Sequence, residues 1–329
     1  MVWRMLAAAK QMGRWTRSQI TGQGLILLYH RISDPAHEKA PDIFSLCVTP
    51  QHFAEQMELL SELFTPVSLE SIVVGIRENN LPNRAIAVTF DDGYADNLYF
   101  AKPILEKFKI PATVFVISGI LGKEFWWDKL TQIIYQPSSL SNKLDLMIGD
   151  HKFSTEINSD HDRDRNILLR KSHRFMRALS YEEKQTAISS LAQWAKHESF
   201  VEQNSRPMTE SELKKLAENG LIEIGAHSVT HQPLRSLSQP QQELEITQSK
   251  LDLEQILQKP IKSFSYPYGL SSDFSKFSVE TVKKANFEYA CSNEIDTIWQ
   301  RSDTYQLPRY WAKDFPGDAF AQYIHKWLR

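Results

Sequence analysis

The alternation of short apolar runs with segments of helical spacing constrains the fold of this chain more than any other feature. A short apolar run is typical of a strand buried on both faces, and helices between such strands place them in a parallel sheet. The expected strands are Gly24–His30, Ala85–Asp91, Pro111–Ile117, Ile222–Ile224, Ile261–Ser265 and Tyr289–Ser292. The expected helices are Pro50–Leu63, Asn97–Phe108, Leu213–Glu218, Pro240–Leu257 and Val279–Ala285. The length of 329 residues is within the range of one α/β barrel.

The alternation breaks between residues 122 and 206, where the sequence is polar and irregular. Within this stretch, Lys143–Ile148 and Phe153–Ile157 alternate on either side of a turn that contains Gly149, which predicts a β-hairpin. The βα rhythm returns at Thr209 with a Thr-Glu-Ser-Glu capping box. We therefore expect a basic amphipathic N-terminal helix (1–23), the first part of a barrel (24–121), an inserted α+β cap (122–206) and the second part of the barrel (207–329).

The first 20 residues carry four basic side chains and no acidic one, with apolar residues at helical spacing. Such a helix lies on an anionic membrane surface or docks on its own domain, and both alternatives stay open. The apolar stretch Leu25–Tyr29 is far shorter than the ~18 residues that span a bilayer, and it is too short for an export signal. We expect a cytoplasmic protein, with peripheral contact at the inner membrane face through residues 1–20 as the further option.

Charge and cysteine content exclude two classes of protein. The formal net charge is −2, whereas a general nucleic-acid binder carries a strong basic excess. The two cysteines, Cys47 and Cys291, are too few for a disulfide framework and have no partners at metal-binding spacing. The oligomeric state stays open.

Three short motifs follow predicted strands, at the edge where barrel enzymes place their reacting groups. They are Thr89-Phe-Asp-Asp-Gly-Tyr94, Gly225-Ala-His-Ser-Val-Thr-His231 and Phe264-Ser-Tyr-Pro-Tyr-Gly269. Each taken alone has an ordinary explanation as a turn. The histidines are four positions apart, a spacing that places two imidazoles on one face of a helical turn.

Taken together, the motifs predict a catalytic metal site. Asp92, His227 and His231 would form a two-histidine, one-carboxylate site that leaves positions open for water and substrate. Asp91 stands next to this site as a base for the proton of a bound water. The joint pattern therefore favours a hydrolase.

The order and sequence of these motifs resemble the NodB-type polysaccharide deacetylases, carbohydrate esterase family 4. The resemblance spans about Gly24–Asp314, and the Thr-Phe-Asp-Asp-Gly pentapeptide is its most specific part. It implies a distorted (β/α) barrel that removes N-acetyl groups from an aminosugar-containing glycan with a divalent metal, usually Zn²⁺. The site residues that it implies are Asp91 as general base, Asp92, His227 and His231 as metal ligands, and the backbone N–H of Tyr268 as an oxyanion donor.

The chain departs from this family at two positions. The arginine that usually precedes Pro-Tyr is replaced by Ser265, and the usual Leu-x-His motif has its best match in Leu307-Pro-Arg309. His30, at the end of the first strand, resembles an early histidine that acts as the acid in deacetylases of biofilm poly-N-acetylglucosamine. A buried structural histidine is the alternative for His30. Arg309 is expected to hold Asp91 or substrate.

The expected substrate contacts are Tyr94, Trp126, Trp127 and Arg309. Tryptophan faces stack on sugars and also pack in cores, and both roles stay open for the tryptophan pair. The insertion is expected to cover the barrel mouth, which favours an oligosaccharide or lipid-linked glycan end over a long polymer. Two other functions stay open: a metal-dependent hydrolase of a non-sugar amide on the same fold, and a catalytically inactive glycan-binding member.

Overall fold

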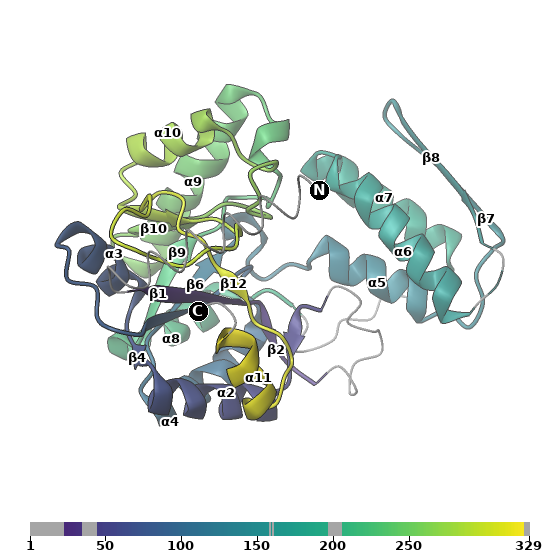
Figure 1. Cartoon of the computed structure of the whole chain (residues 1–329). Coiled ribbons are helices and arrows are strands. Elements are labelled where there is room, and N and C mark those ends of the chain that lie inside the picture. The colour runs from purple at the N-terminus through teal and green to yellow at the C-terminus, as the bar shows by residue number, and fades with distance from the viewer. Residues whose placement is uncertain (1–22, 35–44, 158, 160, 197–205, 326–329) are drawn as a thin grey trace, which may run out of the picture.

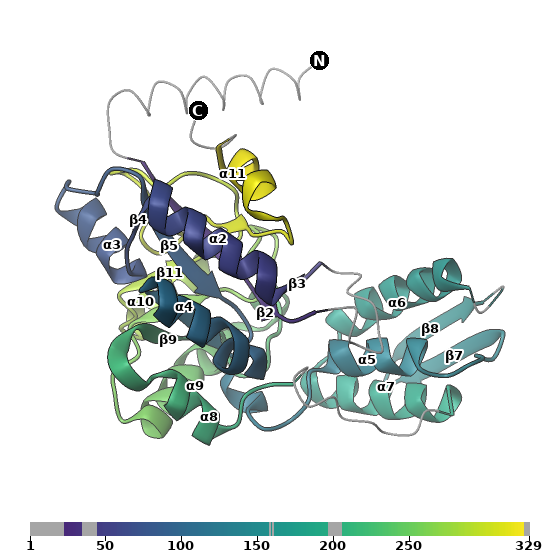
Figure 2. The ribbon, with the colours of Figure 1, turned by 90° about the horizontal axis from the view of Figure 1, so that it is seen from below.

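The structure is a computed structural model of the chain, and residues 23–34, 45–157, 159, 161–196 and 206–325 are described. The predicted helix at residues 1–20 lies outside the described residues. The described chain forms a distorted (β/α) barrel, and the insertion projects to one side of it as a smaller lobe (Figures 1 and 2). This architecture confirms the predicted fold class.

A curled parallel sheet forms the centre of the barrel (Figure 1). Among the described residues its order is β11-β10-β9-β6-β5-β1-β12, with β4 paired to β5, and each of these pairs runs parallel. The strands are β1 (Gly24–Tyr29), β4 (Thr65–Pro66), β5 (Ala85–Phe90), β6 (Ala112–Val116), β9 (Ile222–Ala226), β10 (Ser263–Ser265), β11 (Tyr289–Cys291) and β12 (Tyr310–Trp311). Strands β1, β5 and β6 are buried along their whole length, as their continuous apolar sequences predict.

Helices cover the sheet and begin at the caps that the sequence provides. The side chain of Thr49 accepts a hydrogen bond from the N–H of His52 at the start of α2, and Thr209 and Glu212 form the predicted capping box of α8. The barrel helices are α2 (Pro50–Leu63), α3 (Leu69–Arg77), α4 (Lys102–Phe108), α8 (Glu210–Leu216), α9 (Gln239–Leu257), α10 (Lys276–Lys284) and α11 (Gly317–His325). None of the described helices is long and apolar enough to cross a membrane.

Several shorter elements were not predicted. The expected helix Asn97–Phe108 begins with a π-helical turn, η2 (Asn97–Ala101), before α4. Pro103 has no N–H for the carbonyl of Tyr99, so the regular ladder cannot start there. The remaining elements of the barrel are β2 (Arg31–Ile32), β3 (Cys47–Val48), and the 3-10 turns η3 (Ser118–Ile120), η4 (Glu218–Gly220) and η5 (Leu234–Ser236).

The insertion is more regular than its sequence indicates. It contains α5 (Trp126–Tyr135), the hairpin β7 (Lys143–Ile148) and β8 (His151–Glu156), α6 (Asp162–Arg177) and α7 (Tyr181–Trp194). The hairpin agrees with the prediction to within a few residues. The helices bury a second apolar cluster, which includes Phe125, Leu130 and Leu169 and is continuous with Tyr94 of the barrel. The hairpin lies on the side of this lobe away from the barrel (Figures 1 and 2).

Candidate active site and metal centre

The predicted motifs meet at one edge of the sheet because each follows a parallel strand. Asp91 and Asp92 follow β5, His227 follows β9, and Tyr268 lies just after β10. These strands belong to one sheet and run in the same direction, so their carboxyl ends share an edge. The chain therefore brings together side chains that are more than one hundred positions apart.

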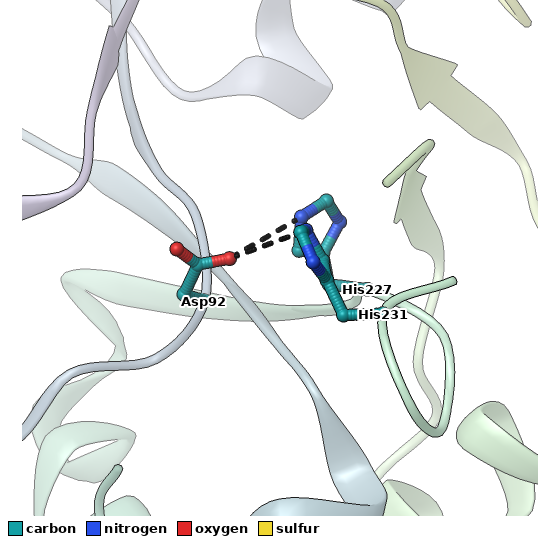
Figure 3. A group of neighbouring side chains, drawn as sticks. All are labelled: Asp92, His227 and His231. Atoms are coloured by element: carbon teal, nitrogen blue, oxygen red, sulfur yellow. Dashed lines mark ion pairs between the residues drawn. The ribbon is translucent and has the colours of Figure 1, made fainter. Parts of the chain in front are cut away.

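Asp92, His227 and His231 form a compact triad (Figure 3). Oδ1 of Asp92 lies 3.6 Å from Nε2 of His227 and 3.5 Å from Nε2 of His231. These separations are too long for hydrogen bonds. They are close to the spacing of about 3.3 Å between two donors that each lie about 2.0–2.1 Å from one tetrahedral Zn²⁺ ion. Oδ1 of Asp92 is buried without a hydrogen-bond partner, so the triad fits a metal ion.

The electrostatics of the triad also fit a cation. Burial and the neighbouring charge of Asp91 hold the pKa of Asp92 well above its ordinary value. Burial lowers the pKa of both His227 and His231, which keeps their rings neutral. Nδ1–H of His227 donates to the carbonyl of Ser265 at 2.7 Å, so the lone pair of Nε2 faces the triad. The triad therefore offers a metal ion two neutral imidazole nitrogens and one carboxylate whose ionised form is destabilised by burial.

The backbone of the triad differs from the prediction. The histidines do not lie on a helical turn: Ser228 and His231 have φ values of +62° and +57°, and Asp92 has +74°. Such left-handed conformations are unfavourable for residues other than glycine and occur at functional sites where surrounding contacts impose them. The carboxylate of Glu245 on α9 accepts from the N–H groups of Val229 and Thr230, both at 2.9 Å, and these bonds replace those of a helix.

Asp91 is held by Arg309. Nη1 and Nη2 of Arg309 donate to the two oxygens of Asp91, each at 2.7 Å, and both side chains are buried. Burial alone would raise the pKa of Asp91, but Arg309, together with the nearby His227 and His30, lowers it to about 2. Ser265 Oγ accepts from Nη2 of Arg309 at 2.8 Å. Arg309 thus occupies the space beside the serine and holds Asp91. It does not line the cavity described below, and its contact with substrate stays a prediction.

A cavity of about 200 Å³ opens over the triad. His30 lines it, and the ring of this histidine packs 5.5 Å from that of Trp311. Burial lowers the pKa of His30 to about 4, and its Nδ1 has no hydrogen-bond partner among the described residues. The structure thus places His30 at the reacting centre, and its role as acid stays a prediction.

Tyr268 lines the same cavity in a strained turn. Its φ is +61°, and Gly269 follows at +71°. A Cβ at Gly269 would lie 2.7 Å from the side chain of Asn293, so only glycine fits there. Nδ2 of Asn293 donates to the carbonyl of Tyr268, and Oδ1 of Asn293 accepts from Arg309. Sequence reasoning missed Asn293, which joins the arginine to the turn. The use of the Tyr268 N–H as an oxyanion donor stays a prediction.

The other predicted substrate contacts are mostly buried. Tyr94 is fully buried and donates its hydroxyl to Asp128 at 2.9 Å, and its contact with substrate stays a prediction. Trp126 packs against His173 in the insertion and does not line the cavity, and its contact with substrate stays a prediction. Trp127 lines the cavity and packs 5.1 Å from the ring of His231. Of the tryptophan pair, only the second is placed to meet a ligand.

Comparison with known proteins agrees with this geometry. The sequence model of the family described as polysaccharide deacetylase matches residues 78–197 and 191–290. A poly-β-1,6-N-acetyl-D-glucosamine N-deacetylase of Staphylococcus aureus is 23% identical over 312 residues, which are 92% of this chain and 82% of that protein. The deacetylase PplD of Streptococcus pyogenes, solved with acetate, superposes with a TM-score of 0.58 at 18% identity over 92% of this chain and 98% of the other. IcaB from Ammonifex degensii superposes with a TM-score of 0.59 at 16% sequence identity, over 93% of this chain and 97% of that chain. At these identities the two structures support the fold alone.

Proposed function

This chain belongs to the polysaccharide deacetylase family, and on that premise we propose that it hydrolyses the N-acetyl group of an aminosugar in a glycan, releasing acetate and leaving a free amine. One observation carries the proposal: an ionised, arginine-held Asp91 lies beside the buried triad of Asp92, His227 and His231, and all four side chains line one cavity. An amide hydrolase needs a base and a cation site in this arrangement.

We propose Zn²⁺ as the metal, because two neutral imidazoles and one carboxylate with open positions suit this ion. When bound, such an ion would lower the pKa of a water molecule toward 7 and would polarise the amide carbonyl. Asp91 takes the proton of the attacking water. Its position is fixed by two hydrogen bonds from Arg309, and its low pKa keeps it ionised before the reaction.

The other steps are assigned to two further residues that line the cavity, Tyr268 and His30. The backbone N–H of Tyr268 donates to the developing oxyanion, a contribution typically worth about 2.7–4 kcal/mol. The leaving nitrogen must be protonated, and His30 is the residue that we assign to this step. With a pKa of about 4, His30 is neutral in the free protein at pH 7. We therefore propose that it relays to the amine the proton that Asp91 has taken from water.

The N-acetylated glycan is the partner that this site would take. The relatives named above include a deacetylase of β-1,6-linked poly-N-acetylglucosamine. Trp127, Tyr268 and Trp311 give the cavity aromatic walls, and such faces pack well against the C–H surfaces of pyranose rings. We propose β-1,6-linked N-acetylglucosamine units as the first substrates to examine.

Metal analysis combined with an acetate-release assay tests this function. We expect purified protein to bind about one divalent ion per chain and to release acetate from N-acetylglucosamine oligomers. Treatment with a chelator should abolish release, and added Zn²⁺ should restore it. A Zn²⁺-loaded protein that releases acetate from no N-acetylated aminosugar, or that cleaves only a non-sugar amide, would overturn the proposal.

A further inference from the structure

The insertion supplies part of the wall around the reacting centre. Trp127 of α5 and His173 of α6 line the cavity together with the metal triad, whereas no residue of the β7–β8 hairpin does. On the barrel side, Leu46 and Trp311 line it next to His30. Aromatic side chains of both the insertion and the barrel therefore line the cavity.

The first attachment of this wall to the barrel runs through Trp127. Nε1–H of Trp127 donates to the hydroxyl of Tyr94 at 2.7 Å, and this hydroxyl donates to Asp128 at 2.9 Å. Tyr94 lies two positions after Asp92, so the wall is bonded to the same loop that carries a triad residue. The three side chains form a continuous, partly buried network, which rigidifies the region.

The second attachment runs through Arg177, at the end of α6. Its guanidinium lies 3.9 Å from the ring centroid of Tyr268, close enough for a strong cation–π contact. The same guanidinium forms an ion pair with the buried carboxylate of Asp273. Asp273 in turn accepts from the N–H of Leu270, two residues after Tyr268. The end of α6 is thus fixed to the turn on the other side of the triad.

The cavity over the triad is small. At about 200 Å³, the cavity is below the range of roughly 300–1,000 Å³ that is usual for sites of drug-sized ligands. One pyranose ring with its acetamido group is the unit that suits this space. An internal unit of a chain needs two exits for its neighbours, and walls bonded to the barrel on both sides of the triad oppose a second exit.

We propose that the site acts on the terminal aminosugar of a glycan, or on a single aminosugar, and that Arg177 is the residue that maintains this selectivity. The proposal rests on the deacetylase function proposed above. The present proposal goes further, because it names the position of the reacting unit in the glycan and the role of the insertion.

The location of the freed amines tests this proposal. Zn²⁺-loaded protein is incubated with β-1,6-linked N-acetylglucosamine oligomers of one to six units that carry an isotope label at the reducing end. Tandem mass spectrometry then locates each free amine. We expect the free amine at one chain end, with at least about a tenfold preference over internal units, which corresponds to about 1.4 kcal/mol.

Variants of α6 test the assignment of Arg177. Arg177→Met should reduce the terminal preference about tenfold, and Arg177→Lys, which keeps the charge without the planar stacking group, should reduce it less. Arg174→Met, an exposed position on the same helix, is the matched control and should leave the pattern unchanged. Thermal unfolding of each variant identifies any loss of folding, and the Lys variant keeps the test valid if the Met variant is unstable.

The outcomes separate the two proposals. Acetate release with amines at internal units would overturn the terminal selectivity and leave the deacetylase function intact. Unchanged selectivity in both Arg177 variants would overturn the role assigned to this arginine. Acetate release from no oligomer and no free sugar would overturn the deacetylase function and, with it, this inference.

Discussion

Replacing Arg309 with methionine is the most direct test of how this site keeps its base ionised. The two buried hydrogen bonds of 2.7 Å to Asp91 would be lost, and the carboxylate would stay buried without its cation. Breaking a buried ion pair in this way typically costs about 3–5 kcal/mol of folding free energy. A protein with about 5–15 kcal/mol of stability can lose this and still fold.

The sign of the pH dependence follows from the pKa of Asp91. In the native protein this pKa is about 2, below the value of about 3.9 for an unfolded chain. The ionised pair therefore contributes about 2–3 kcal/mol of stability above pH 4, and this contribution is lost as the pH falls toward 2. In Arg309→Met, the lowering effect of the arginine is lost, and burial, the largest single influence on this group, raises the pKa of Asp91 above its ordinary value. The dependence of stability on pH then has the opposite sign, and the variant gains stability as the pH falls from 7.

Two measurements follow this change. The acid limb of kcat/KM against pH, taken with Zn²⁺-loaded protein, should move to higher pH in the variant. Urea unfolding of metal-free protein at pH 5 and pH 7 should show the variant more stable at pH 5. In both measurements, Arg309→Lys should give values between those of the unmodified protein and Arg309→Met, because lysine keeps a charge and loses the bidentate geometry. An acid limb at the same pH in all three proteins would refute the role given to Arg309.

Three further substitutions test the remaining assignments. Asp91→Asn should retain bound metal in elemental analysis and lose turnover, because the amide cannot take the proton of water; acetate release that persists without deamidation would contradict this. His227→Ala should lose both metal and turnover, and a metal content equal to that of the unmodified protein would remove this residue from the ligand set. His30→Ala should lower kcat by about 10²–10⁴-fold, the usual contribution of proton transfer, with KM nearly unchanged; an unchanged kcat would return this histidine to a structural role.

The sheet and the triad were predictable because both depend on patterns that are local in sequence. The apolar runs before Asp91 and His227 identify β5 and β9, and parallel strands place their carboxyl ends together. The sequence therefore predicts that the three side chains of the triad lie together, although it does not predict the backbone conformation between His227 and His231. Spacing alone suggested a helical turn, and the contacts of Glu245, which lies on another helix, decide otherwise.

Contacts between distant segments were the part that sequence could not supply. Trp126 and Trp127 are adjacent and chemically equal, yet one packs inside the insertion and the other lines the cavity. Arg177 and Asp273 carry no motif, and only the docking of α6 on the barrel brings them together. The membrane contact predicted for residues 1–20 stays a prediction, since these residues lie outside the described part of the chain.

The position of Arg309 bears on whether this chain is an enzyme or an inactive glycan-binding module. Position 265 carries a serine where the family usually has an arginine, and this difference favours the binding module. Arg309, in the loop before β12, donates to the carboxylate of Asp91 and also to the hydroxyl of Ser265. A buried, ionised pair of this kind is expensive to desolvate, and apolar residues of similar volume usually stabilise a fold at least as well. A binding module has no use for an ionised base beside a metal site, whereas a hydrolase requires one, so this pair favours catalysis.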